Sequence, residues 1–244
     1  MDLIGNAIGE AGRLLFSGDS GAWGIIGLSL RVSGISVLIA TVIGVPIGYL
    51  VAVRRFVGRR LALVLVNTGM GLPPVVAGLI VYVFVSRQGP IFELWEQITG
   101  TLPERILYTV PVMIVAQVII STPLVIGVAA AAIGSVPVEM RLQARSLGAS
   151  PLQEALLTIR EARRGVMAAI VAGFGGIISE VGAVMMVGGN IKGRTQVMTT
   201  AIVEETRAGN FGLALALGFI LIGIAFVINN GLTALQQSGG RYER

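Results

Sequence analysis

Five apolar stretches follow one another along this chain, separated by shorter polar segments. Each is at least as long as the roughly 20 residues that a helix needs to cross a hydrocarbon core about 30 Å thick. They occupy residues 25–53, 61–86, 107–134, 166–188 and 211–235. The pattern predicts an all-α polytopic membrane protein with five transmembrane helices in a single domain, 1–244.

Residues 1–24 come before the first of these stretches and have a different pattern. Their apolar side chains recur with helical spacing and leave a polar face, as at Ile4 and Ile8. An amphipathic helix of this kind lies in the plane of the membrane surface. We therefore expect an N-terminal interfacial helix.

The longest polar segment, 135–165, separates the third and fourth stretches and has the pattern of two short helices. We expect the first to cover 138–147 and to end there, because Gly148 follows and glycine commonly comes just after a helix end. Ser150 and Gln153 then have the spacing of a capping box, which starts the second helix.

Apolar residues of this segment stand among arginines and fall on one side of each helix. They are Leu142, Ala144, Leu147, Leu152, Leu156 and Ile159. Exposed apolar residues in a charged frame suit docking into a groove on another protein. The alternative is a pair of surface helices packed on their own bundle.

The second apolar stretch contains two consecutive prolines, Pro73 and Pro74. Proline removes a backbone donor and clashes with the preceding turn, so the freed backbone groups must find other partners. We expect the second span to be broken or sharply kinked here, beside protein or a water-filled cavity.

Composition restricts the chemistry that the chain can perform. Hydrophobic residues make up 54% of it and charged residues 13%, and the mean hydropathy is +0.85. The absence of cysteine and histidine excludes disulfides, thiolate or imidazole metal sites and histidine acid–base catalysis. No G-x-x-x-x-G-K-[ST] loop is present, so nothing predicts nucleotide binding in this chain. We expect no catalytic residue, metal or cofactor of its own, and no nucleic acid partner.

The arginines indicate how the chain is oriented in the bilayer. The loop 54–60 carries four of them and no acid, the segment 135–165 carries five, and Arg241 and Arg244 lie near the C-terminus. Cytoplasmic loops are enriched in cations, and these three regions fall on the same side of a five-span topology. The prediction is an N-terminus outside and a C-terminus inside.

Two charged residues lie within apolar stretches, Arg31 in the first and Glu180 in the fourth. Both are several residues from the outer end of their span, and an isolated ion at that depth is costly. We therefore predict an intramembrane ion pair between them. It serves either to hold the bundle together or, through Glu180, as part of a gate.

Two sequence segments resemble a known family. The run A-R-S-L-G-A-S-P, 144–151, resembles the coupling loop of type I ABC importer permeases, whose consensus E-A-A-x-x-x-G is followed by I-x-L-P. Ala144, Gly148 and Ile159 match it, whereas Leu142 and Gln143 replace the usual Glu and Ala. The segment 178–206, with its S-E-V-G-A and G-N-I elements, resembles the permeases of oxyanion importers, with the tungstate branch first and molybdate and sulfate permeases next.

The resemblance implies a set of partners. Such permeases form homodimers in the cell inner membrane, above two ABC ATPase subunits that bind ATP and Mg²⁺. An extracytoplasmic binding protein hands over the oxyanion, here most simply tungstate, to the dimer in the lipid bilayer. The alternatives are a permease for molybdate, sulfate or vanadate, or, in a different class, a stand-alone channel or secondary transporter.

The resemblance also assigns candidate roles to residues. The ATPase-coupling loop would include Glu139, Ala144, Arg145, Leu147, Gly148, Ser150 and Ile159. The translocation path or gate would include Ser179, Glu180, Gly182, Asn190, Thr199 and Thr200. In this scheme Gly148 is the turn between the coupling helices, and Glu139 and Arg145 are contacts at the rim.

Overall fold

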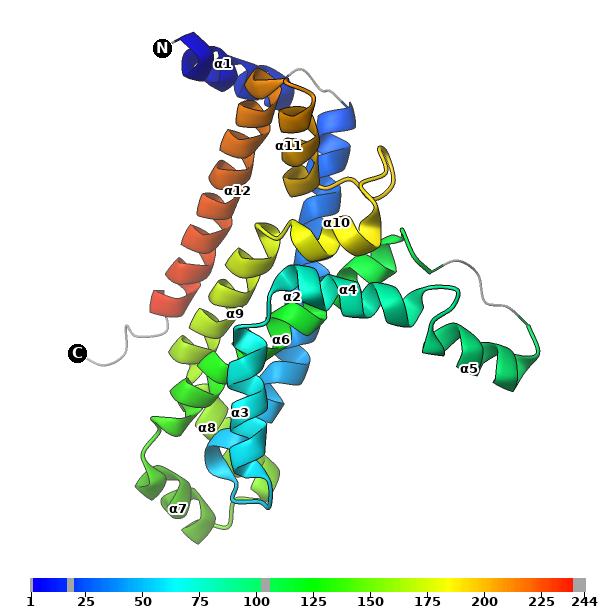
Figure 1. The fold of residues 1–244 in the computed structure, drawn as a ribbon. Coiled ribbons are helices and arrows are strands. Elements are labelled where there is room, and N and C mark those ends of the chain that lie inside the picture. Colours follow the sequence, from blue (N-terminus) through cyan, green and yellow to red (C-terminus); the bar gives the residue numbers. More distant parts are fainter. Residues whose placement is uncertain (1, 17–19, 102–105, 239–244) are drawn as a thin grey trace.

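The computed structural model of the protein describes residues 2–16, 20–101 and 106–238, and this part of the chain contains helices and no strand (Figure 1). The all-α architecture predicted from the apolar pattern is therefore confirmed. Arg241 and Arg244, used above as an orientation signal, lie outside the described residues.

The body of the molecule is a bundle in which α2 (Ser20–Val53) packs along α6 (Val110–Gly134) and α9 (Arg163–Ile178). These helices are apolar on all sides, as expected for helices that face both protein and lipid. Small residues allow α2 and α6 to approach closely. A Cβ atom added at Gly48 would come within 3.1 Å of the Ile126 carbonyl oxygen.

Buried polar side chains also join the helices of the bundle. Gln117 of α6 donates from Nε2 to the carbonyl of Ile177 in α9 at 3.2 Å. Ser29 of α2 accepts from the backbone N–H of Met198 at 2.8 Å. Because a buried polar group without a partner is expensive, these bonds favour one arrangement of the helices.

Among the residues that the structure describes, four helical stretches are long and apolar enough to cross a membrane, and there are five if the bent pair of α9 with α10 (Gly182–Gly188) is counted as one span. The four are Ser20–Val53, Pro74–Thr99, Val110–Gly134 and Phe211–Gln237. The last lies within α12 (Phe211–Ser238). Four to five apolar helices agree with the number predicted, although the boundaries differ from those expected, most of all in the first two stretches.

The first difference concerns the N-terminal region. The expected amphipathic helix forms as α1 (Asp2–Phe16), which buries Ala7 and Ala11 and packs against α12, and its place at the membrane surface stays a prediction. However, α2 already begins at Ser20, so the first long helix starts five residues earlier than expected. Ala22 is buried in this added turn, which explains why the helix extends there.

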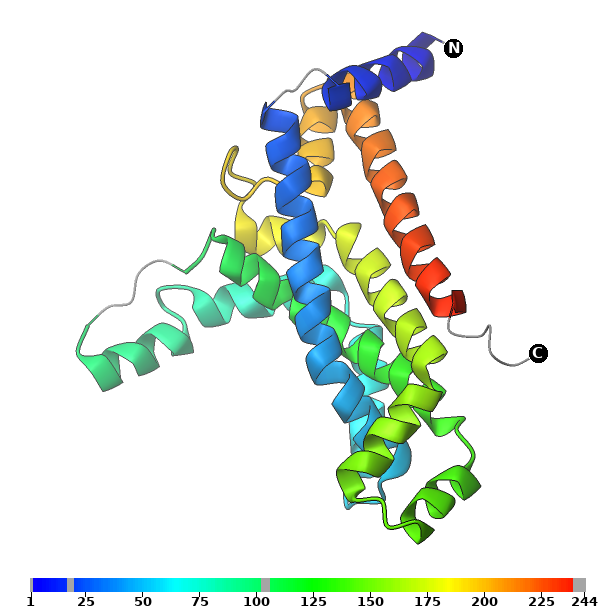
Figure 2. The same cartoon turned by 180° about the vertical axis from the view of Figure 1, so that it is seen from behind.

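The second difference concerns the second apolar stretch, which forms two helices, α3 (Arg59–Met70) and α4 (Pro74–Val85). The break falls at the consecutive prolines, as predicted: Pro73 is the N-cap of α4 and Pro74 its first residue. A further helix, α5 (Pro90–Thr99), was not expected and extends away from the bundle. Both views show α4 and α10 lying across the long axis of α2 (Figures 1 and 2).

The contact between α4 and α10 depends on a glycine. A Cβ atom at Gly78 would lie 2.7 Å from the backbone Cα of Ala183, a distance that requires the two helices to separate. We expect Gly78→Ala to destabilise the protein by about 1–3 kcal/mol through overpacking. Thermal unfolding of the purified chain tests this.

Gly176→Ala is the matched control, because Gly176 also lies inside a helix and its added Cβ would meet Leu124 at an ordinary 3.9 Å. Alanine should there be neutral or stabilising by up to about 1 kcal/mol, since it favours helices more than glycine does. Equal unfolding temperatures for the two variants would contradict the close packing of α4 on α10.

Candidate functional site

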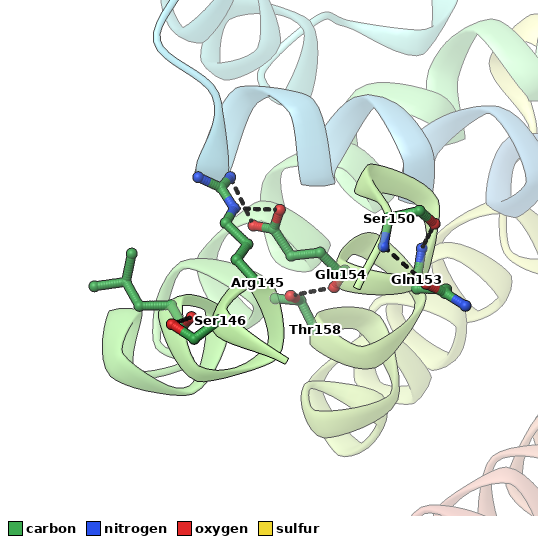
Figure 3. A network of polar contacts seen from close by, with 7 residues as sticks. Arg145, Ser146, Ser150, Gln153, Glu154 and Thr158 are labelled. Carbon is green, nitrogen blue, oxygen red and sulfur yellow. Dashed lines mark hydrogen bonds and ion pairs between the residues drawn. The ribbon is translucent and has the colours of Figure 1, made fainter. Parts of the chain in front are cut away.

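The polar segment between α6 and α9 folds as two short helices, α7 (Val138–Ser146) and α8 (Pro151–Glu161), joined by a glycine turn (Figure 3). Gly148 has a φ of +85°, a left-handed conformation that L side chains rarely adopt. Its N–H donates to the Arg145 carbonyl at 2.9 Å, which closes the end of α7. The predicted role of Gly148 as the turn residue is confirmed.

The start of α8 is fixed by the predicted capping box. The Ser150 hydroxyl accepts from the Gln153 N–H at 3.3 Å, and the Gln153 side chain accepts from the Ser150 N–H at 2.7 Å. Both orphan donors of the helix start are thereby satisfied. The local sequence thus defines both ends of the turn, independently of the rest of the bundle.

Arg145, expected as a contact at the rim, forms an ion pair inside the loop, and its contact with a partner stays a prediction. Its guanidinium donates to both carboxylate oxygens of Glu154, from Nε at 2.8 Å and from Nη2 at 3.1 Å (Figure 3). The Glu154 side chain is 2% exposed and the Arg145 side chain 50%. The hydrogen bond and charge of Glu154 raise the pKa of Arg145 above its ordinary value. This bidentate pair, which we call the Arg145–Glu154 clasp, locks α7 against α8.

The outer face of the loop formed by α7 and α8, the predicted coupling loop, remains apolar. Leu147 is 89% exposed and Leu152 69% exposed. A surface hollow of about 500 Å³ runs along one face of α7 and is lined by Glu139, Leu142, Gln143, Ser146 and Leu147. An exposed apolar hollow with a polar edge is typical of a protein docking site.

Two residues assigned to the docking face point instead into the protein. Ala144 is buried, and Ile159 packs against the core beside Val136 and Ala162. The helices therefore use one side to pack on their own bundle and the other to face outward. Packing on the bundle, one of the two interpretations left open by the sequence, holds for the inner face, and docking of a partner on the outer face stays a prediction.

A second feature lies near the middle of the molecule, where two helix breaks meet. One is the break between α3 and α4, and the other separates α9 from α10, whose axes differ by 58°. Gly182, the first residue of α10, lies so close to α4 that an added Cβ would come 2.5 Å from Val75 Cγ2. The break at Ser179–Val181 was not predicted. The sequence feature that could have indicated this break is the polar pair Ser179–Glu180 within an apolar stretch.

The predicted ion pair between Arg31 and Glu180 is not formed. Glu180 instead accepts at Oε1 from the Ala183 N–H at 3.1 Å and so satisfies a free donor at the start of α10. Its carbonyl accepts from the Thr199 hydroxyl at 2.9 Å. Arg31 lines a different pocket, of about 640 Å³, together with Lys192. The reason is the bend in α9–α10, which gives Glu180 a backbone partner that a straight helix would not offer.

Of the predicted path residues, Ser179, Glu180, Gly182 and Thr199 thus gather around the α9–α10 break. The exposed Ser179 hydroxyl donates to the Gly175 carbonyl at 3.0 Å. Thr200, the next residue after Thr199, is fully buried, and its hydroxyl donates to the Val197 carbonyl at 3.0 Å. Whether any of these residues touches a transported anion stays a prediction.

Asn190 belongs to a third group, the turn between α10 and α11 (Met198–Arg207). Its side chain donates to Glu204 Oε2 at 2.7 Å, as does that of Gln196, and Lys192 lies 3.1 Å from Glu204 Oε1. Glu204 and Gln196 were missed by sequence reasoning because nothing in their spacing shows that the turn folds back on α11. Glu204 holds this turn in place.

The Glu204 network predicts an acid-sensitive turn. The hydrogen bond from Lys192, with those from Asn190 and Gln196, lowers the pKa of Glu204 below its ordinary value of 4.5. Because the pKa of Glu204 is lower in the folded protein, its ionised form stabilises the turn at any pH above the ordinary pKa. This stabilisation is lost as the pH falls through the lowered pKa. Trp23, in the pocket that Lys192 also lines, will report the change by fluorescence once Trp95, the other of the two tryptophans, is replaced by phenylalanine.

The fluorescence should stay constant from neutral pH to about 4.5 and change below it, since glutamate then gains a proton. Glu204→Gln should remove this transition, whereas the control Glu205→Gln, on the neighbouring residue, should keep it. An unchanged acid transition in Glu204→Gln would show that another group is responsible.

Comparison with known proteins gives a consistent result. Residues 44–238 match the family model described as "Binding-protein-dependent transport system inner membrane component". The chain is 39% identical over 210 residues to a probable anion ABC transporter permease protein of Haloferax volcanii, covering 84% of this chain and 86% of that one. It is 35% identical over 237 residues to the tungstate uptake system permease protein TupB of Peptoclostridium acidaminophilum, covering 97% and 100%.

Solved structures with the same fold are more distant in sequence. A bacterial ABC transporter involved in the import of the acidic polysaccharide alginate matches with a TM-score of 0.76 at 18% identity, over 93% of this chain and 81% of that one. The inward-facing MetNI methionine ABC transporter matches with a TM-score of 0.66 at 18% identity, over 91% and 95%. At this identity the likeness concerns the fold.

Proposed function

Because this chain belongs to the family of inner-membrane components of binding-protein-dependent transport systems, we propose that two copies of it form the translocation path of an ATP-driven oxyanion importer. Separate ATPase subunits drive this importer from the cytoplasm, and an extracytoplasmic protein delivers the anion. The coupling loop, with its preformed turn and apolar outer face, is the observation that carries the proposal.

The loop meets the mechanical needs of a coupling element. Transmission of force requires a rigid connection, and here the Arg145–Glu154 clasp fixes α7 relative to α8, while the capping box fixes the start of α8. It also requires a surface for the ATPase, which the hollow along α7 offers. Movement of the ATPases would pass through α8 into α9, which follows it directly.

The double helix break supports a translocation path near Ser179 and Gly182. Irregular backbone at membrane depth is tolerated where it is buried in protein or lines a cavity, and broken helices form the substrate sites of many transporters. Backbone N–H groups and hydroxyls suit a dianion that must be released again, because strong fixed charge would retain it. Glu180, which caps α10, shapes the break and is not a ligand of the anion.

Tungstate is the proposed cargo, in line with the TupB relatives from Peptoclostridium acidaminophilum and Campylobacter jejuni, which are 35% and 34% identical. The molybdenum permease ModB of Azotobacter vinelandii, at 32% identity, makes molybdate the runner-up. Sulfate and vanadate follow as related oxyanions.

Reconstituted transport tests this function. The chain, its ATPase and its binding protein, co-purified and placed in proteoliposomes, should accumulate tungstate only when ATP is supplied on the ATPase side. Inhibition of tungstate uptake by molybdate, sulfate and vanadate ranks these anions as alternative cargoes. Flux through the purified chain alone, without ATP, would support a channel or secondary transporter and reject the importer.

A further inference from the structure

A basic pocket lies beside the coupling loop, between the end of α2, the loop that follows it and α7. Its volume is about 430 Å³. It is lined by Ala52, Val53, Arg54, Arg55, Arg59, Val138, Arg141, Arg145 and Glu154. The two arginine-rich regions that the sequence placed on one side of the membrane therefore share one concave site.

The positive charge in this pocket is not neutralised by the protein. Its one carboxylate, Glu154, is already held by Arg145. Within the described residues, none of the other four lining arginines forms an ion pair with a carboxylate. Like charges this close repel one another, so an anion in the pocket would stabilise it.

Two buried polar groups, one in the lining of the pocket and one outside it, also lack hydrogen-bond partners. Arg141 Nε is buried and donates to nothing, although its guanidinium lines the pocket. The hydroxyl of Tyr49, which lies one helical turn before Ala52 and Val53 and is not a lining residue, is likewise buried without a partner. A buried donor left unpaired is destabilising, and a ligand with acceptor oxygens would supply the missing partner. By contrast, Arg59 is held in place by its bond from Nε to the Val51 carbonyl at 2.7 Å.

We propose that this pocket binds a phosphate-type anion, supplied by the headgroup of an anionic phospholipid. Guanidinium groups match phosphate oxygens in a bidentate fashion, and four of them converge here. The pocket begins where the apolar α2 ends and arginines begin, the depth at which lipid headgroups lie. This site goes beyond the proposed function and depends neither on the cargo nor on the ATPase.

Lipid binding to the full-length chain tests the proposal. The chain is placed in nanodiscs of phosphatidylcholine alone or with phosphatidylglycerol, and its unfolding temperature and retained lipids are measured. Phosphatidylglycerol should raise the unfolding temperature of the wild type. Arg55→Gln should weaken its binding roughly tenfold, the effect of one charge-assisted hydrogen bond. Arg141→Gln should do the same, and if it does not fold, Arg55→Gln remains informative.

Arg60→Gln is the matched control. Arg60 is exposed like Arg55, carries the same charge and lies in the same basic segment, but it does not line the pocket. It should keep the phosphatidylglycerol effect. Equal losses in Arg55→Gln and Arg60→Gln would reduce the site to general attraction between cations and the membrane and overturn the proposal.

Two further experiments identify what binds in the pocket. Protection of the wild type by inorganic phosphate in phosphatidylcholine nanodiscs, with no preference among lipids, would keep the anion site and reject the lipid as its source. If Arg55→Gln impairs co-purification of the ATPase and lipid has no effect, the arginines bind an acidic protein surface, and the proposal is wrong.

Discussion

Replacing Gly148 with proline is expected to abolish co-purification of this chain with its ATPase. Gly148 has a φ of +85° and donates its N–H to the Arg145 carbonyl. Proline fixes φ near −65° and has no N–H, so the turn cannot keep its shape. Forming the turn with proline should cost roughly 3 kcal/mol, comparable with proline inside a helix. The affinity of the loop for the ATPase should therefore fall more than about a hundredfold.

The control for this substitution is at the other end of the molecule. Gly209 follows α11 as Gly148 follows α7, with a φ of +80°, a donated N–H to Thr206 and no atom near its added Cβ. Gly209→Pro should strain the backbone as much and leave ATPase binding intact. Gly148→Asn should bind almost normally, because asparagine tolerates the left-handed conformation. If both proline variants lost the ATPase, the effect would be one of general stability.

The Arg145–Glu154 clasp is expected to respond unequally to loss of its two members. Arg145→Met leaves the nearly buried Glu154 carboxylate without its cation, which costs about 3 kcal/mol, at the low end for buried pairs because Arg145 is half exposed. Glu154→Leu leaves Arg145 free to reach water and should cost only about 1 kcal/mol. Limited proteolysis of the loop, with thermal unfolding of the whole chain, measures the difference.

The double variant decides whether this asymmetry comes from the buried charge. Arg145→Met combined with Glu154→Leu removes both charges and should recover most of the stability lost in Arg145→Met, since apolar pairs often replace buried ion pairs without loss. Additive losses in the double variant would show that Arg145 and Glu154 act independently, and the rigid connection through the coupling loop would lose its main support.

The coupling loop was predictable from the sequence because its structure is local. The glycine turn and the capping box each depend on residues within a few positions of one another, such as Ser150 and Gln153. The apolar lengths predicted the long helices for the same reason. The break at Pro73 and Pro74 follows from the covalent structure of proline and needs no tertiary information.

The parts that were missed depend on contacts between distant segments. Glu154 looks like a surface residue of α8 in the sequence, but the fold buries its side chain almost completely. The predicted pair of Arg31 and Glu180 assumed a straight fourth span, whereas the bend before α10 gives Glu180 a backbone N–H to accept from. The helical spacing of apolar residues placed Ile159 on the outward face of the loop, whereas in the structure it packs against the bundle.

Accessibility of a single cysteine at Leu147 is the most direct test of the central claim that the coupling loop faces the cytoplasm and is held by an ATPase. The chain has no cysteine, and Leu147 is 89% exposed, so Leu147→Cys gives one reactive thiol. A membrane-impermeant reagent should label it only from the cytoplasmic side, and bound ATPase should protect it. Ile8→Cys, at the opposite end in α1, should label from outside. Labelling of Leu147→Cys from the outside alone would contradict the account.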